Sequence, residues 1–148
     1  MRIVVGSDHA GLVLKDHLAV RLRAQGHEVE DVGTNSSASC DYPDLANAVG
    51  SALTSGRVDF GILVCGTGQG MAMTANRISG IRAAVLSDTF SARSTRAHND
   101  ANVLCLGQRV VGSGLAEDIV DAFLNTPFEG GRHAGRVAKM MANDVEKA

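Results

Sequence analysis

The chain has 148 residues, with 14 Lys and Arg against 16 Asp and Glu, so its formal net charge is −2 at pH 7. With aromatic residues at 3% and no Trp, this near-neutral balance excludes the basic, base-stacking surface of a general nucleic-acid binder. The sequence also lacks the polybasic run of a membrane-surface protein and the roughly 18 consecutive apolar residues of a membrane span. Its length fits one domain over residues 1–148.

The expected cellular location follows from the N-terminus and the cysteines. Residues 1–6 form a short apolar run without a following cleavage site, which is typical of a first strand and not of a signal peptide. The three cysteines, Cys40, Cys65 and Cys105, are odd in number and widely spaced, so they suggest no disulfide framework. We therefore expect a protein of the reducing cytoplasm.

Glycines divide the chain into short apolar runs and helical stretches, and 17 are present. In chain order, strands are expected over residues 2–6, 27–32, 60–65, 82–86 and 102–106. Helices are expected over residues 12–25, 43–55, 71–78, 89–97, 113–124 and 132–147. The alternation predicts a five-stranded parallel sheet with helices on both faces. In such a sheet, ligands bind beyond the carboxyl ends of the strands, so the segments that follow the strands are the candidates for a site.

A glycine-rich loop with the sequence Cys-Gly-Thr-Gly-Gln-Gly follows the third predicted strand, at residues 65–70. Glycines at alternate positions let backbone N–H groups turn toward an anion, and the next helix adds its positive end. Two other interpretations are a turn that only has to be tight and a dinucleotide fingerprint. The spacing GxGxG does not match the GxGxxG fingerprint, and the absence of a following lysine argues against nucleoside triphosphate chemistry.

Cys65 stands at the end of that strand, beside the glycine loop. Thiolates are favoured near helix N-termini, so this thiol is a candidate nucleophile or general base. The alternative is a small apolar side chain in the core, which is the commonest fate of a free cysteine. Cys105 lies inside an apolar run, and we expect it in the core.

Two polar segments fall at opposite edges of the predicted sheet. Asp8 and His9 follow the first strand, where His9 can donate to a phosphate or carbonyl and Asp8 can orient a sugar hydroxyl. The alternative for Asp8 is a helix cap. His98, Asn99 and Asp100 follow a helix and precede a strand, so they lie at the other edge. They form either a polar turn or, if a second subunit presents them to the first, part of a catalytic site.

Arg132 and Arg136 begin the last predicted helix and share one of its faces. Two guanidinium groups on one face suit a phosphate dianion, and Arg109 after the fifth strand can join them. The alternative is a solvated basic face. His17 and His27 are expected on the surface, and the sequence identifies no partner for either. No group of histidines, cysteines and carboxylates has the sequence spacing of a metal site.

Six segments then carry a resemblance to a known family: residues 6–11 (Gly-Ser-Asp-His-Ala-Gly), 41–43 (Asp-Tyr-Pro), 65–68 (Cys-Gly-Thr-Gly), 80–83 (Gly-Ile-Arg-Ala), 98–102 (His-Asn-Asp-Ala-Asn) and 130–133 (Gly-Gly-Arg-His). Together they resemble the type B ribose-5-phosphate isomerases, a family that includes galactose-6-phosphate isomerase subunits and allose-6-phosphate isomerases. The resemblance implies a Rossmann-like three-layer α/β/α fold without metal or organic cofactor. It also implies a homodimer that can pair into tetramers, with each site at the subunit interface.

The same resemblance implies roles for individual residues. Cys65 matches the general base that takes the C2 proton of the open-chain aldose, and Thr67 the hydroxyl that assists proton transfer between O1 and O2. His98 matches the acid/base of ring opening, presented by the partner subunit. The positions that match substrate contacts are Asp8, His9, Tyr42, Gly66, Gly68, Gly70, Asn99, Arg109, Arg132 and Arg136. Within this set, the loop glycines would hold the enediolate through their N–H groups, and His9 and the three arginines would bind the phosphate.

The reaction so implied interconverts D-ribose 5-phosphate and D-ribulose 5-phosphate through an enediolate, a step of the pentose phosphate pathway. One alternative is an isomerase of a four- or six-carbon aldose phosphate, because chain-length discrimination depends on the depth of the pocket. Another is a non-catalytic phosphosugar- or nucleotide-binding module. Cys65 disfavours that alternative, since binding alone needs only the glycines and arginines.

Overall fold

The computed structural model describes the backbone of residues 1–147 and the side chains of residues 1–144. Its strands are β1 (Arg2–Ser7), β2 (Glu28–Asp31), β3 (Phe60–Cys65), β4 (Ala83–Val85) and β5 (Val103–Gly107). They form one sheet in the order β2-β1-β3-β5-β4, and every neighbouring pair is parallel. The predicted five-stranded parallel sheet is therefore confirmed.

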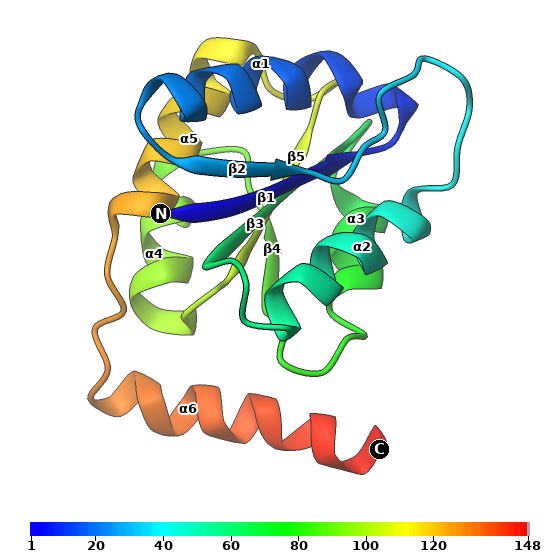
Figure 1. Cartoon of the computed structure of the whole chain (residues 1–148). Coiled ribbons are helices and arrows are strands. Elements are labelled where there is room, and N and C mark those ends of the chain that lie inside the picture. Colours follow the sequence, from blue (N-terminus) through cyan, green and yellow to red (C-terminus); the bar gives the residue numbers. More distant parts are fainter. Residues whose placement is uncertain (148) are drawn as a thin grey trace.

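Helices cover both faces of the sheet, as the strand–helix alternation predicts. They are α1 (Leu12–Ala24), α2 (Tyr42–Thr54), α3 (Gln69–Ala75), α4 (Thr89–Asn99), α5 (Ser113–Asn125) and α6 (Arg132–Met141), with 3-10 turns η1 (His9–Gly11) and η2 (Ala142–Lys147). Figure 1 shows α1 and α5 on one side of the sheet and α2 and α3 on the other. Alternate strand residues enter the two cores: Ile62 packs on the α1 side and Leu63 on the α2 side.

β3 lies at the centre of the sheet, which explains its sequence. All of its residues after Phe60 are buried, because β1 and β5 flank it and helices cover both of its faces. In the sheet, β2 lies on one side of β1 and β3 lies on the other, so the order of the strands reverses direction at β1. The carboxyl ends of β1 and β3 therefore border the crevice where ligands of open α/β sheets bind.

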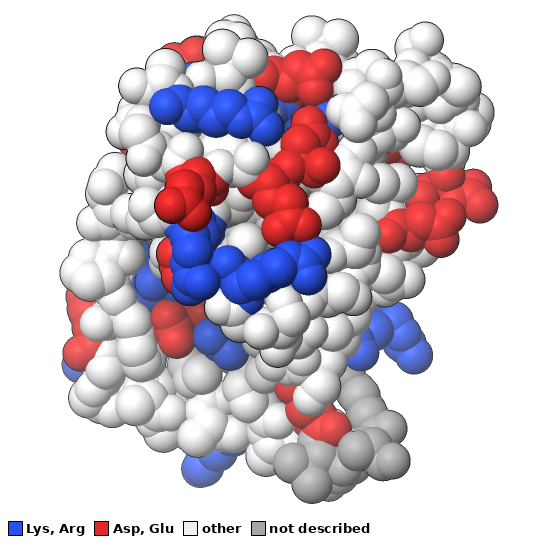
Figure 2. Space-filling view, in the orientation of Figure 1, with Lys and Arg blue, Asp and Glu red and all other residues white. Residues whose placement is uncertain are grey.

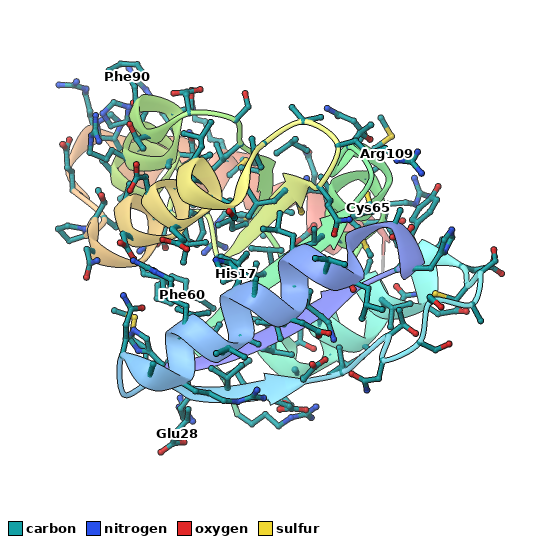
Figure 3. The ribbon with its side chains drawn as sticks, turned by 90° about the horizontal axis from the view of Figure 1, so that it is seen from above. His17, Glu28, Phe60, Cys65, Phe90 and Arg109 are labelled. Carbon is teal, nitrogen blue, oxygen red and sulfur yellow. The ribbon has the colours of Figure 1, made fainter. Side chains whose placement is uncertain are left out.

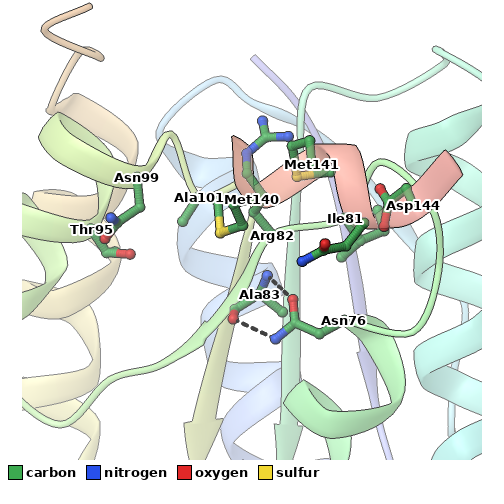
Figure 4. A pocket seen from close by; sticks show the side chains of 11 residues that line it. Asn76, Ile81, Arg82, Ala83, Thr95, Asn99, Ala101, Met140, Met141 and Asp144 are labelled. Atoms are coloured by element: carbon green, nitrogen blue, oxygen red, sulfur yellow. Dashed lines mark hydrogen bonds between the residues drawn. The ribbon is translucent and has the colours of Figure 1, made fainter. Parts of the chain in front are cut away.

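Two helices end three or more residues before the predicted end, each near a polar side chain that makes a contact there. The helix expected over residues 71–78 spans Gln69–Ala75 instead. Directly after it, the Asn76 amide pairs with both backbone groups of Ala83 on the edge strand β4, at 2.9 and 2.7 Å (Figure 4). The helix expected to reach residue 147 ends at Met141. Beyond it, Asp144 Oδ2 accepts the Gly80 N–H at 2.8 Å, a local contact of the kind that competes with a helix.

The helix α6 projects away from the layered body and contacts α4 (Figure 1). A cavity of about 370 Å³ lies between the C-terminal part of α6, α4 and the edge strand β4. Met140 and Met141 line it from the α6 side (Figure 4). Met140 is 44% exposed. The amphipathic α6 thus leaves part of its apolar face uncovered within a single chain.

The visible face of the molecule carries charges of both signs. Figure 2 shows acidic and basic side chains interspersed there, without a continuous basic stripe. Several are paired, among them Arg57 with Glu30 and Arg2 with Asp59, each at 2.8 Å. None of the helices within residues 1–147 has both the length and the hydropathy needed to cross a membrane.

Candidate active site

Cys65 ends β3 with its side chain almost fully buried, at 6% exposure. Its Sγ accepts the backbone N–H of Gly68 at 3.1 Å. The predicted position of Cys65 beside an N–H-rich loop is thus observed, and the loop curls back onto the sulfur.

The loop that follows Cys65 depends on two glycines, one in the loop itself and one on the neighbouring strand β5. Gly68 has φ +80°, a left-handed conformation that side chains disfavour, and this conformation directs its N–H toward Cys65. Gly107 on β5 supports the loop from below: a Cβ there would lie 2.8 Å from Thr67 Cα and 2.9 Å from Thr67 O. The loop and β5 are therefore in direct backbone contact.

A Gly107→Ala variant is expected to lose about 1–3 kcal/mol of unfolding free energy, because the added methyl meets backbone that cannot rotate away. Urea unfolding measures this loss. Gly114→Ala is the matched control, since a Cβ at Gly114 meets nothing within 4 Å and alanine suits the helix α5. Equal stability of the two variants would contradict the close approach of Thr67.

Asp8 and His9 lie next to this loop, at the end of β1. Asp8 Oδ1 accepts the N–H groups of Ala10 and Gly11 at 3.0 and 3.2 Å, so the predicted cap is confirmed. His9 Nδ1 accepts the backbone N–H of Cys40 at 3.2 Å. Because Nδ1 is the acceptor, the neutral ring carries its proton on Nε2, which makes Nε2 a donor toward a ligand.

The segment that delivers the Cys40 N–H is anchored by a buried lysine. Lys15 on α1 has no exposed side-chain surface. Its Nζ donates to Asp31 Oδ2 at 2.7 Å and to Thr34 O at 2.8 Å. This ion pair ties α1 to the end of β2 and to the start of the polar loop that reaches His9. Nothing in the sequence indicates this buried ion pair, because a lysine within a helix is normally exposed.

Tyr42 and Arg109 complete this side of the crevice. Tyr42 begins α2, and its ring packs so closely on Gly70 that a Cβ at residue 70 would lie 2.7 Å from ring carbons. Arg109 follows β5 and lies against Gly66. Its backbone N–H donates to Gly66 O at 3.1 Å, which joins the ends of β3 and β5. Figure 3 shows Cys65 and Arg109 together at one end of the molecule.

Eight of the thirteen predicted site residues therefore line one cavity of about 300 Å³. They are Asp8, His9, Tyr42, Cys65, Gly66, Thr67, Gly70 and Arg109. Gly68 adjoins it through its bond to Cys65. We call this cavity the thiol half-site.

A second group gathers elsewhere. His98 and Asn99, at the end of α4, share a cavity of about 250 Å³ with Arg136 and His133 on α6. Arg132 begins α6 and is exposed. The turn after Asn99 is held by Asp100, which has φ +49° and pairs with Arg96 and Arg82 at 2.9 and 3.2 Å. We call the cavity of His98 and Arg136 the histidine half-site.

Within one chain, the two half-sites lie at opposite ends of the strands. The thiol half-site is where the strands end, and the histidine half-site is on the side where they begin. Cys65 is the last residue of β3, and Phe60 is the first. The guanidinium of Arg96, two residues before His98, lies 4.8 Å from the Phe60 ring centre. A strand of this length separates its ends by about 17 Å. The predicted separation of His98 from Cys65 is thus observed, and Arg109 does not converge with Arg132 and Arg136 within one chain.

Comparison with known proteins connects this arrangement to a family. The sequence matches the Ribose/Galactose Isomerase family over residues 3–140. It is 50% identical over 141 residues to ribose-5-phosphate isomerase B of Escherichia coli K12, with 95% of each chain covered. The chain belongs to the ribose/galactose isomerase family. The resemblance seen in its motifs is therefore confirmed.

Solved structures of this family share the fold closely. The structure of Clostridium thermocellum ribose-5-phosphate isomerase B matches all of both chains with a TM-score of 0.98 at 49% identity. The structure of Mycoplasma genitalium ribose-5-phosphate isomerase B, with bound ribulose-5-phosphate, has a TM-score of 0.93 at 41% identity, covering 98% of this chain and 97% of that one. The expected three-layer α/β/α architecture is confirmed.

One cysteine and two histidines outside the half-sites also had predicted surroundings. Cys105 is fully buried, and burial raises the pKa of its thiol, so it is a core residue as predicted. His17 and His27 have partners that the sequence did not identify: His17 Nε2 lies 2.6 Å from Glu117 Oε1, and His27 Nδ1 lies 3.2 Å from the amino group of Met1. Both partners come from distant parts of the sequence, which spacing alone does not reveal.

Proposed function

We propose that the chain interconverts D-ribose 5-phosphate and D-ribulose 5-phosphate. The observation that carries the proposal is the thiol of Cys65, buried at the end of β3, bonded to the Gly68 N–H and facing a cavity with His9 and Arg109. Two relatives support the proposal. The 50% identical Escherichia coli protein is named ribose-5-phosphate isomerase B, and the Mycoplasma genitalium protein has ribulose-5-phosphate bound in its structure. The reaction belongs to the pentose phosphate pathway.

In the proposed mechanism Cys65 is the general base. Its thiolate takes the C2 proton of the open-chain aldose, and the resulting thiol returns a proton to C1. O2 loses its proton and O1 gains one, and Thr67 assists this exchange. The costly feature is the negative charge on the enediolate oxygens, which preorganised donors stabilise. The Gly68 N–H already bonds to Cys65, so the other N–H groups of residues 66–70 are proposed as donors to the enediolate.

The remaining residues are proposed to bind and open the sugar. In the thiol half-site, Asp8 and Tyr42 contact the sugar, while Arg109 and the Nε2–H of His9 hold the phosphate. Phosphate binding is remote from C1 and C2, so its energy serves to hold the flexible open chain. His98 acts as acid/base in ring opening with Asn99 beside it, and Arg132 and Arg136 add charge at the phosphate.

These roles require a homodimer, because a sugar phosphate cannot reach both half-sites of one chain. We propose that the thiol half-site of one subunit faces the histidine half-site of its partner, and that dimers can pair further. The projecting helix α6, with Met140 exposed beside a cavity of about 370 Å³, supports an intersubunit contact there. We place the enzyme in the cytoplasm, which the free thiols of Cys40, Cys65 and Cys105 support.

Proton NMR of ribose 5-phosphate in D₂O with chelator-treated protein tests the proposed function. We expect ribulose 5-phosphate to form with deuterium from solvent on the carbon that receives the proton, since the thiol of Cys65 exchanges with water. Conversion of a four- or six-carbon aldose phosphate in its place would correct the substrate. Saturable binding without proton exchange would contradict an isomerase and favour the phosphosugar-binding module.

A further inference from the structure

His98 on α4 meets Glu129 and His133, which lie four residues apart at the start of α6. The imidazoles of His98 and His133 are stacked, with centres 4.3 Å apart and an angle of 12° between planes. Glu129 Oε2 lies 3.4 Å from His133 Nε2 and 3.9 Å from His98 Nε2. One ligand atom from each residue therefore falls within 4.8 Å of the other two.

The backbone holds these three residues in place. The Glu129 N–H donates to Ala97 O at 3.0 Å, so the segment before α6 is fixed to the end of α4 next to His98. The His133 N–H donates to Gly130 O at 3.0 Å, and the His133 side chain is almost fully buried. The backbone positions of the three residues are therefore fixed by the fold.

Two stacked imidazoles at this distance repel each other when both are charged. Neutral imidazole is the form that binds a metal ion. The nearby Arg132 and Arg136 oppose a cation, and the carboxylate of Glu129 offsets one of these two positive charges.

The donor set matches a known preference among metal ions. Two imidazoles and one carboxylate, with a fourth position left to water, make up a common zinc site. Such nitrogen-rich sets favour zinc and its first-row neighbours over Mg²⁺ and Ca²⁺, which prefer oxygen. Tetrahedral bonds of about 2.1 Å place the ligand atoms roughly 3.4 Å apart. The three atoms must therefore approach one another, and the half-exposed His98 ring must turn out of its stack with His133 to aim Nε2 at the ion. Glu129, with 59% of its side chain exposed, is free to make that approach.

We propose that His98, Glu129 and His133 form a binding site for a first-row divalent cation such as Zn²⁺, and that the bound ion inhibits the enzyme. The inhibition rests on the proposed function, because a metal on His98 Nε2 removes the group assigned to ring opening. The ion is an inhibitor here and takes no part in the isomerisation.

Binding is tested with chelator-treated protein carrying Cys65→Ala, so that the active-site thiol adds no competing ligand. Zn²⁺ affinity is measured by competition with a colorimetric indicator, and Co²⁺ serves as a visible-absorption probe of coordination. Glu129→Ala is expected to weaken Zn²⁺ binding by at least about tenfold, since even outer partners of metal ligands contribute that much. Ring resonances of His98 and His133 in NMR are expected to shift on Zn²⁺ addition.

Glu117→Ala is the matched control, because it removes a carboxylate that pairs with His17 and Arg21 and leaves the proposed site intact. Unchanged affinity in Glu129→Ala, or an equal loss in Glu117→Ala, would overturn the site. In the enzyme with Cys65 present, Zn²⁺ is expected to slow isomerisation reversibly, and Glu129→Ala to keep its basal turnover and resist Zn²⁺. Equal inhibition of both enzymes would assign inhibition to another site. A protein without isomerase activity would contradict the proposed function and leave the binding measurement valid.

Discussion

A Cys65→Ala variant is expected to lose isomerase turnover by roughly 10²–10⁴-fold, the usual contribution of a general base. The methyl group cannot take the C2 proton, while the donors around the loop and the phosphate contacts stay in place. Initial rates with ribose 5-phosphate measure the loss, and NMR titration with the sugar phosphate measures retained binding. The far-UV circular dichroism spectrum is expected to match that of the unaltered protein, because the change removes one atom from a small side chain.

Cys40→Ala is the matched control for this prediction. The Cys40 thiol is half-buried, and only the backbone N–H of that residue bonds to His9. Its removal is therefore expected to leave turnover within about twofold, since the backbone contact that orients His9 is unaffected by the side chain. If Cys65→Ala retained the activity of the Cys40→Ala protein, Cys65 would not be the base and the mechanism would have to use another group.

Two inactive variants are expected to restore each other's activity when they share a dimer. Coexpression of Cys65→Ala with His98→Ala yields mixed dimers in which one site combines an intact thiol half-site with an intact histidine half-site. With random pairing, about a quarter of the full activity is expected, because half of the dimers are mixed and each has one intact site. Tagged subunits allow the mixed dimer to be purified and assayed.

The control for complementation pairs Cys65→Ala with Thr67→Ala. Both residues belong to the thiol half-site, so every site of that mixed dimer carries a damaged thiol half-site. Its activity is expected to remain near that of the two parent variants. Recovery in this control, or no recovery with His98→Ala, would contradict a site shared between subunits.

The part of the fold that the sequence predicted best is the part with a strong local signal. β3 is an uninterrupted apolar run that ends at the glycine loop, and its observed bounds agree with the prediction. The order of strands in the sheet has no comparable local signal. The predicted end of α3 was wrong, because the Asn76 side chain pairs with the backbone of Ala83, seven residues away, and local helical spacing does not indicate such a contact.

In the candidate site, too, the features with a local sequence signal were predictable and those without one were not. The thiol half-site was predictable because parallel strands bring their following segments to one edge, so Asp8, Cys65 and Arg109 had to lie close together. The position of His98 at the other edge also follows from strand–helix alternation. Its contact with Glu129 and His133 does not, because α6 leaves the layered body and no periodicity in the sequence specifies where a projecting helix folds back.

The pairing of Asn76 with Ala83 also bears on how the protein avoids aggregation. An exposed sheet edge is a template on which a further strand can add, and repeated addition leads to fibrils. Asn76 occupies the free N–H and C=O of Ala83 on the short strand β4, and the opposite edge strand, β2, carries the acidic sequence Glu-Val-Glu-Asp. Both borders of the sheet are thus protected against amyloid-type growth, and association between copies is directed to helices and loops.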